Sequence, residues 1–586
     1  MYDNIYIMLQ HLKQAWHNKM LLGDDDGNNV GYNHQYGYLI PKARTIDREL
    51  DLESDLPHDF LKTLDEDDEH LLEDDDYELL STITNVRTTI GAKDEGGVEE
   101  ENDDNANAKN GASPSQAHQQ QHEHPPLNIL ILYADDMRHD TLGSASENLV
   151  HTPFLDQLAK EGIRFVQNCV TTSICWISRA TYYSGQWYSR HGTFTINAIR
   201  ERGEHLFAQY WNETFPGMLK SHGYYTGHVG KWHSSAPLRK GLEFDFVKSY
   251  YGHHWMPRNG KQIHVTKANE EDAINFLRTR PDKDQPFMLS VNFFAPHSKD
   301  GAAEQYFPQP SSMSLYENIT IPKAPSATEE AWKKMPEFFT ERNIGRIRYH
   351  WRFDTAEKYQ KMMKNYFRLV SEVDASSQAI VEELKRQGVL DSTLVIFTSD
   401  NGMFLAEHGL AAKFFPHQES IRVPLIIRDP RMRQEFIGTD NEDFTLSVDL
   451  ASTILGAAQI TPPARMQGRD ISALYLETSA DADNADGKSW REEFFYEMPS
   501  LKLLKLGEDE IPSCQALVRK DLKLMWWPFY HKYQLFDLNI DPYEMNDLLA
   551  GVSMNNITAN EFSDFKYRNM TMEMVRTMRE LHKSVL

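Results

Sequence analysis

Residues 128–136 read Asn-Ile-Leu-Ile-Leu-Tyr-Ala-Asp-Asp, an apolar run that ends in two carboxylates. The apolar part is too short to cross a membrane, and it is rich enough in isoleucine and leucine for a strand buried on both faces. Two later runs have the same form: residues 287–294 (FMLSVNFF) lead to His297, and residues 394–398 (LVIFT) lead to Ser-Asp-Asn-Gly. We therefore predict three buried strands, each followed by polar side chains.

Two stretches between these runs have the pattern of helices. Residues 151–162 place Thr152 as a cap before a proline and end at Gly162. Residues 359–384 repeat apolar side chains at helical spacing and precede the run at 394–398. Strands that alternate with helices predict an α/β fold, in which a large, mostly parallel sheet is sandwiched by helices.

The length of 586 residues allows more than one domain. Residues 127–490 hold the alternating strands and helices and form the predicted catalytic domain. Residues 479–488 (SADADNADGK) are small and polar, which indicates a surface loop. Residues 491–586 then form a smaller C-terminal α+β subdomain, and within it residues 519–527 have the pattern of a strand pair.

The first 126 residues differ in composition from the rest. Positions 51–126 hold 22 acidic residues against 4 basic ones, and the stretch ends in a run rich in glutamine and histidine. We predict an acidic, largely disordered extension over residues 1–126. The run could bind a transition metal weakly, but a solvated linker is the better interpretation.

Charge and hydropathy exclude some classes of partner. An acidic chain without basic patches argues against nucleic acid or an anionic membrane surface. No run of eighteen apolar residues exists, so we expect no membrane span. Residues 1–20 lack a basic start followed by an apolar core, and we do not interpret them as a signal peptide.

Four side chains follow the predicted strands at 128–134 and 394–398: Asp135, Asp136, Asp400 and Asn401. Ligands of open α/β sheets bind beyond the carboxyl ends of the strands, so we expect these side chains to converge. Three carboxylates and one amide oxygen suit Ca²⁺ or Mg²⁺ better than zinc, and one divalent ion is expected. For either pair alone, a helix cap or a tight turn is the better interpretation.

Residues 175–185 (CWISRATYYSG) resemble the nucleophile segment of the sulfatase family, within the alkaline phosphatase superfamily. In that family the cysteine is oxidised to formylglycine, whose hydrated aldehyde attacks sulfate esters. This sequence has Ile177 where the family most often has proline. The alternative for Cys175 is a small buried thiol. Residues 226–233 and 408–413 are similar to two further elements of the family, as found in its iduronate-sulfatase-like and arylsulfatase-like members.

The resemblance implies a role for each matching residue. The converted Cys175 would hold the metal ion together with Asp135, Asp136, Asp400 and Asn401. Arg179 and Lys231 would hold the formylglycine oxygens, and His233 would handle the proton of the second hydroxyl. Lys413 and His297 would bind sulfate and assist the leaving oxygen. A snorkelling surface lysine and a structural histidine are the alternatives for the last two.

The implied activity is hydrolysis of a sulfate ester through a formylglycine-sulfate intermediate. We expect a sulfated carbohydrate as substrate, because Trp255 and His254 could line the pocket and favour a sugar ring over a small aryl sulfate. One rival is a phosphodiesterase or phosphonate hydrolase of the same superfamily. The other is a non-hydrolytic anion-binding homologue in which Cys175 is not converted.

The resemblance also implies a partner and a compartment. Conversion of Cys175 requires a formylglycine-generating enzyme, and such sulfatases are secreted, lysosomal or otherwise enter the secretory pathway. Four triplets permit N-glycosylation, at Asn212, Asn318, Asn556 and Asn569. If Cys175 is consumed, the remaining two cysteines allow one disulfide at most.

Overall fold

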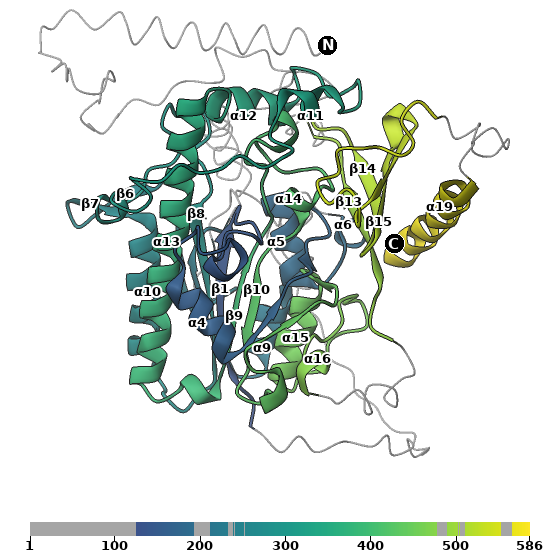
Figure 1. Ribbon diagram of the computed structural model, residues 1–586. Helices are drawn as coiled ribbons and strands as arrows, with labels where there is room; N and C mark the ends of the chain where they lie inside the picture. The colour runs from purple at the N-terminus through teal and green to yellow at the C-terminus, as the bar shows by residue number, and fades with distance from the viewer. Residues whose placement is uncertain are drawn as a thin grey trace, which may run out of the picture. The chain divides into compact units, whose positions relative to one another are not determined.

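A computed structural model of the chain describes residues 125–192, 211–232, 238, 241–250, 252–476, 489–501, 503, 510–552 and 565–586. They belong to the unit formed by residues 117–586 and are drawn as the coloured ribbon in Figure 1. The predictions for the acidic extension, apart from its last two residues, and for the loop at 479–488 lie outside the described residues.

The predicted α/β fold with a large, mostly parallel sheet is confirmed. The sheet has eight strands, in the order β11 (Thr439–Asn441), β2 (Ile163–Phe165), β10 (Leu425–Arg428), β9 (Thr393–Ser399), β1 (Asn128–Asp135), β8 (Phe287–Pro296), β4 (Tyr225–Gly230) and β5 (Phe246–Ser249). Strand β1 lies between β8 and β9 and runs parallel to both. Strand β10 runs antiparallel to β9 and β2, and the other pairs are parallel.

Strand β1 shows why this sheet needs helices on both faces. Leu130 and Leu132 belong to one hydrophobic cluster, whereas Ile131 and Tyr133 belong to another, as the alternation of side chains in a strand requires. All four are fully buried. Such a strand is stable only when both faces are covered, which is why its sequence is continuously apolar.

Helices cover the two faces accordingly (Figure 1). One face carries α4 (Pro153–Glu161), α10 (Val265–Thr279) and α13 (Ala356–Arg386), which contact one another and strands β8 and β10. The other carries α5 (Cys175–Ser184), α9 (Phe215–Ser221) and α15 (Asp449–Ala457). Helix α13 contains the predicted helix at 359–384, and α4 lies within the one predicted at 151–162.

The start of α4 differs from the sequence prediction. Thr152 occupies the position before the helix, but its hydroxyl makes no capping bond and instead accepts a hydrogen bond from the Gly143 amide at 2.7 Å. The free amides of the first turn donate to a distant side chain, the Asp374 carboxylate of α13, from Leu155 at 2.7 Å and Phe154 at 3.3 Å. An acidic side chain at this end is also favoured by the helix dipole.

Replacing Asp374 with alanine is expected to lower the free energy of unfolding by about 1–3 kcal/mol, since it leaves buried amide groups unpaired. Asp374 is buried, so water cannot replace the lost acceptor. Urea denaturation measures the change. Asp391→Ala is the control, because the side chain of Asp391 is 92% exposed; equal midpoints for the two variants would contradict the assignment.

The same carboxyl gives the stability a pH dependence. Burial raises the pKa of Asp374 to about 7, although the amides of Leu155 and Phe154 lower it. Between about pH 4 and pH 7 the folded protein therefore keeps a proton that the unfolded chain has released, and this stabilisation is lost as the pH rises through about 7. From pH 5 to pH 7 the wild type is expected to lose stability relative to Asp374→Asn, which cannot titrate. Parallel profiles of stability against pH for the two proteins would exclude this role of Asp374.

A smaller antiparallel sheet forms the predicted C-terminal subdomain. Its strands are β13 (Glu493–Met498), β14 (Cys514–Arg519), β15 (Leu522–Trp527) and β16 (Lys532–Asp537), and α19 (Phe565–Val585) packs against it. The predicted strand pair begins earlier than expected, because Arg519 ends β14 and only residues 522–527 form the second strand. One hydrophobic cluster joins this sheet to Ile174 and Ile177, which flank Cys175.

Candidate active site

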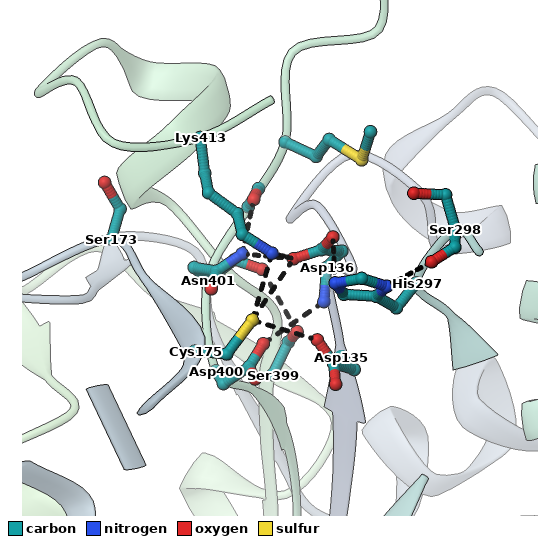
Figure 2. Close-up of polar contacts among 12 residues, drawn as sticks. Asp135, Asp136, Ser173, Cys175, His297, Ser298, Ser399, Asp400, Asn401 and Lys413 are labelled. Atoms are coloured by element: carbon teal, nitrogen blue, oxygen red, sulfur yellow. Dashed lines mark hydrogen bonds and ion pairs between the residues drawn. The ribbon is translucent and has the colours of Figure 1, made fainter. Parts of the chain in front are cut away.

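The predicted strands deliver their polar residues to one edge of the sheet. Strands β1 and β9 pair in register up to Ala134 and Ser399, so Asp135 and Asp400 leave the sheet at neighbouring positions. His297 follows β8, on the other side of β1. Figure 2 shows these side chains together with Cys175, the first residue of α5.

The side chains after β1 and β9 bind one another directly. The Asp136 amide donates to Asp400 Oδ1 at 3.1 Å, and Asn401 Nδ2 donates to Asp136 Oδ1 at 2.6 Å. Asp136 has a φ of 61°, an unfavourable conformation for a residue with a side chain. Backbone strain of this kind occurs where the surroundings fix a functional side chain.

Cys175 is almost fully buried, and its sulfur contacts groups of both charges. Cys175 Sγ donates to Asp135 Oδ1 at 3.4 Å and accepts from Lys413 Nζ at 3.0 Å (Figure 2). Burial, and next the charge of Asp135, raise the pKa of the thiol well above its ordinary value. The unmodified side chain therefore stays a neutral thiol, which is a poor nucleophile.

Arg179 and Lys231 lie on the far side of Asp135. Arg179 follows Cys175 by one helical turn, so both side chains share a face of α5; its guanidinium donates to Asp400 Oδ2 at 3.0 Å. Lys231 follows β4, and its Nζ forms an ion pair with Asp135 Oδ2. Burial and the nearby Asp400 raise the pKa of Asp135 to about 7, even though both cations lower it.

Lys413 and His297 approach Asp136 from two loops. Lys413 Nζ lies 2.5 Å from Asp136 Oδ1, and His297 Nε2 lies 3.6 Å from Asp136 Oδ2. Burial lowers the pKa of His297 well below its ordinary value. Its Nδ1 contacts the Ser298 carbonyl oxygen, which can only accept, so Nδ1 carries the proton and Nε2 faces Asp136 as a bare acceptor.

Several ligand atoms of this cluster fit a cation. One atom each of Asp135, Asp136, Cys175 and His297 lies within 4.8 Å of the others. Buried Asn401 Oδ1 has no hydrogen-bond partner among the described residues. An acceptor without a donor, next to carboxylates and an unprotonated imidazole nitrogen, matches the surroundings of a divalent ion. Asp400 lies outside this group of four; its oxygens accept from the Asp136 amide and from Arg179.

The remaining predicted residues are placed differently. His233 lies outside the described residues. His254 is 1% exposed and packs its ring 5.1 Å from that of Phe294, which in turn contacts His297. His254 is therefore behind the site in the core. Trp255 is partly exposed and begins β6 (Trp255–Arg258), so it is the residue of this pair that a substrate could reach.

Sequence reasoning missed two residues of the site. Asn292 Oδ1 accepts a hydrogen bond from Arg179 at 3.0 Å, and the Arg179 guanidinium lies 5.0 Å from the centre of the Tyr133 ring. Both residues belong to the apolar strands themselves. The signal available in the sequence was the side-chain amide of Asn292 within the apolar run 287–294, since a buried polar side chain needs a hydrogen-bond partner.

Two further expectations concern the chain as a whole. Cys169, Cys175 and Cys514 are all buried and free, so the disulfide that the sequence allowed is not formed. In the part of the chain that the structure describes, every helix is too short or too polar to span a bilayer.

Comparison with known proteins identifies the family. The profile of the family described as sulfatase matches residues 127–460, and that of the C-terminal part of N-sulphoglucosamine sulphohydrolase matches residues 406–569. An N-acetylglucosamine-6-O-sulfatase of Bacteroides thetaiotaomicron is 27% identical over 504 residues, which cover 74% of this chain and 84% of the relative.

Two solved structures share the fold. BT4656, in complex with its substrate D-glucosamine-2-N,6-O-disulfate, superimposes with a TM-score of 0.61 at 24% identity, covering 78% of this chain and 98% of the other. The phosphonate monoester hydrolase of Agrobacterium radiobacter has a TM-score of 0.58 at 19% identity, covering 78% and 96%. Since the sulfatase profile covers more than half of the chain, this protein belongs to the sulfatase family and is a sulfuric ester hydrolase.

Proposed function

We propose that this sulfatase removes sulfate from a carbohydrate at the cluster around Cys175. One observation carries the proposal: residues far apart in sequence meet within contact distance of the Cys175 sulfur and of Asp136, at the carboxyl edge of the sheet. The cluster combines acceptors for a divalent ion with three buried cations, Arg179, Lys231 and Lys413. Hydrolysis of a sulfate ester requires both kinds of group.

A sugar sulfate is the substrate class that the relatives support. The relative that matches 74% of this chain is a sulfatase of N-acetylglucosamine 6-O-sulfate. A pocket for such a substrate needs apolar or aromatic faces beside its polar groups. Trp255 is partly exposed in the hairpin formed by β6 and β7 (Lys261–His264), and its ring offers such a face.

The chemistry also requires groups that the chain does not encode. Oxidation of Cys175 to formylglycine, followed by addition of water to its aldehyde, would supply a hydroxyl for attack and a second hydroxyl for release of sulfate. A divalent ion, Ca²⁺ or Mg²⁺, held by Asp135, Asp136, Asp400, Asn401 and the converted Cys175, would polarise the sulfate. His297 Nε2 is a further candidate ligand on geometric grounds.

The cations of the chain have separate tasks in this proposal. Lys413 would bind a sulfate oxygen, since its ammonium already contacts the Cys175 sulfur and Asp136. Arg179 and Lys231 would hold the oxygens that replace the thiol, on the side of Asp135. His297 would assist departure of the sugar oxygen after its Nε2 has taken up a proton, which it then donates to that oxygen. His233 keeps its predicted role with the second hydroxyl.

Paired esters test the proposal against its nearest rival. We expect kcat/KM for N-acetylglucosamine 6-sulfate to exceed that for the 6-phosphate by at least about 100-fold, equivalent to about 2.7 kcal/mol of transition-state binding. Preference for a phosphodiester or for a phosphonate monoester over the sulfate would instead make the protein a phosphodiesterase or phosphonate hydrolase on the same fold. Binding of sulfated sugar without turnover would indicate the non-hydrolytic homologue.

Trp255→Ala tests the carbohydrate assignment. Loss of one stacking face is expected to lower kcat/KM for a sulfated disaccharide about tenfold, and to change that for a small aryl sulfate much less. Trp526→Ala is the matched control, because Trp526 is also partly buried but stacks on Tyr533 in the C-terminal sheet. An unchanged preference between the two substrates would remove Trp255 from the pocket.

The route to the active protein follows from this chemistry. We infer that a formylglycine-generating enzyme converts Cys175, in spite of Ile177, and that the protein matures in the secretory pathway on its way to a lysosome or the outside. Asn318 is exposed, so its triplet is accessible to glycosylation, whereas Asn556 lies outside the described residues. A mobility shift on treatment with an N-glycosidase, smaller in Asn318→Gln because Asn212 and Asn569 are also exposed, would support this.

A further inference from the structure

One side chain of the C-terminal sheet, that of Tyr496, contacts two segments of the active site. Tyr496 lies in β13 and is fully buried. Its hydroxyl donates to the Phe414 carbonyl oxygen at 2.9 Å, and it lies 2.6 Å from Ser173 Oγ. Phe414 follows Lys413 directly, and Ser173 precedes Cys175 by two positions. One hydroxyl thus joins the segment that carries the sulfate-binding cation to the segment that carries the nucleophile precursor.

The hydrogen bonds around Tyr496 have one consistent direction. Since its single proton goes to Phe414, the hydroxyl can only accept from Ser173. Ser173 in turn accepts from Ser420 Oγ at 2.9 Å. Burial raises the pKa of Tyr496 well above its ordinary value, so the hydroxyl keeps its proton. The three hydroxyls form a chain that ends on the backbone next to Lys413.

The backbone at Phe414 needs such a restraint. Phe414 has a φ of 86°, in a region that bulky residues rarely adopt. Its amide donates to the Ser173 carbonyl oxygen at 3.0 Å, while its own carbonyl oxygen accepts from Tyr496. Strained conformations persist only where the surroundings hold them in place. With both peptide groups held, Lys413 is aimed at Cys175.

Neighbouring contacts show that β13 supports the nucleophile segment along its length. The Glu497 amide donates to the Thr171 carbonyl oxygen at 3.0 Å, and Trp187 Nε1 donates to the Phe495 carbonyl oxygen at 3.0 Å. Thr171 precedes α5 and Trp187 follows it. Within this support, Tyr496 is distinctive because it also contacts the segment of Lys413.

We propose that Tyr496 is a positioning residue of the sulfatase reaction, whose hydroxyl fixes Lys413 against Cys175. The proposal rests on the assignment of Cys175 and Lys413 to the active site. It gives the C-terminal sheet a part in catalysis, because a residue more than eighty positions after Lys413 sets the geometry of the site.

Tyr496→Phe removes the hydroxyl and keeps the ring. With the fully converted protein and a sulfated sugar, kcat is expected to fall about 10- to 100-fold, as small misplacements of a catalytic group do, while KM changes less than about threefold. Tyr475→Phe is the matched control: Tyr475 is equally buried, and its hydroxyl donates to Asp429 at 3.0 Å, away from the cluster. A kcat equal to that of the control would overturn the proposal.

A second measurement separates positioning from a general loss of packing. In a Lys413→Met background, the further change Tyr496→Phe is expected to lower kcat by about twofold at most, because the lysine through which it acts is gone. A full, multiplicative loss in that background would show that Tyr496 acts elsewhere.

A third measurement does not depend on the substrate. Hydrogen exchange of the Phe414 amide is expected to be at least about tenfold faster in Tyr496→Phe than in the wild type, with no change in β1. Unchanged exchange would overturn the proposal even if the enzyme is active. If the wild type hydrolyses no sulfate ester, the proposed function fails, and the exchange result still reports on whether Tyr496 holds this segment.

Discussion

Lys413→Met is expected to lower kcat for sulfate-ester hydrolysis at least about 100-fold, because removal of one preorganised charge from a buried site costs this much or more. Lys413 is 4% exposed and is the described cation that contacts both the Cys175 sulfur and Asp136 Oδ1. Methionine keeps most of the volume, so packing is preserved while the charge is lost. Steady-state kinetics on a sulfated sugar give the result, and Lys413→Ala is expected to abolish turnover.

Two controls make this result interpretable. Lys413→Arg restores a charge with a different shape and is expected to recover part of the activity. Lys361→Ala removes a lysine whose side chain is 52% exposed and should leave kcat unchanged. Circular dichroism establishes that each variant is folded. If folded Lys413→Met turns over like the wild type, Lys413 is a structural lysine and its assignment is wrong.

Asp400→Asn is expected to lower kcat at least about 100-fold and to reduce the bound divalent metal. Asn retains an oxygen for the Asp136 amide, which binds Asp400 Oδ1 at 3.1 Å, but it lacks the charge that pairs with Arg179. Loss of a carboxylate lowers the affinity of a site for Ca²⁺ or Mg²⁺. Metal analysis of the purified variant and kinetics with added Ca²⁺ measure both effects. Asp400→Ala should be inactive.

Asp429→Asn is the matched control for Asp400. Asp429 is also buried in an ion pair, with Arg431, but it follows β10, whose end lies at the opposite edge of the sheet because β10 runs antiparallel to β9. Its loss should leave metal content and kcat as in the wild type. Full activity and metal content in Asp400→Asn would remove Asp400 from the site.

Local patterns in the sequence were sufficient to predict three neighbouring strands of the sheet and the polar residues that follow them, whereas Cys175, Arg179, Lys231 and Lys413 were predicted from the family resemblance. Strands β1, β8 and β9 appear as short apolar runs, and each is followed by the residues that meet at the sheet edge. Parallel strands of one sheet end at the same edge, so the fold class predicts that Asp135 and Asp400 converge, while the structure shows that their strands are direct neighbours.

Contacts between distant segments could not be predicted in this way. Asp374 binds the first turn of α4 from 219 positions away, and Tyr496 binds Phe414 from 82 positions away. Neither residue lies in a sequence pattern from which its hydrogen-bond partner can be predicted. The conformation of Phe414 is likewise set by its surroundings, since phenylalanine has no preference for a positive φ.

The mass of the tryptic peptide from Phe165 to Arg179, which contains Cys175, reports whether this residue is converted to formylglycine in the active enzyme. The protein is produced in a host with a formylglycine-generating enzyme, and its specific activity is measured on the same sample. We expect an aldehyde in place of the Cys175 thiol, in a fraction that rises in proportion to sulfatase activity. Full activity from protein in which Cys175 is entirely thiol would contradict it.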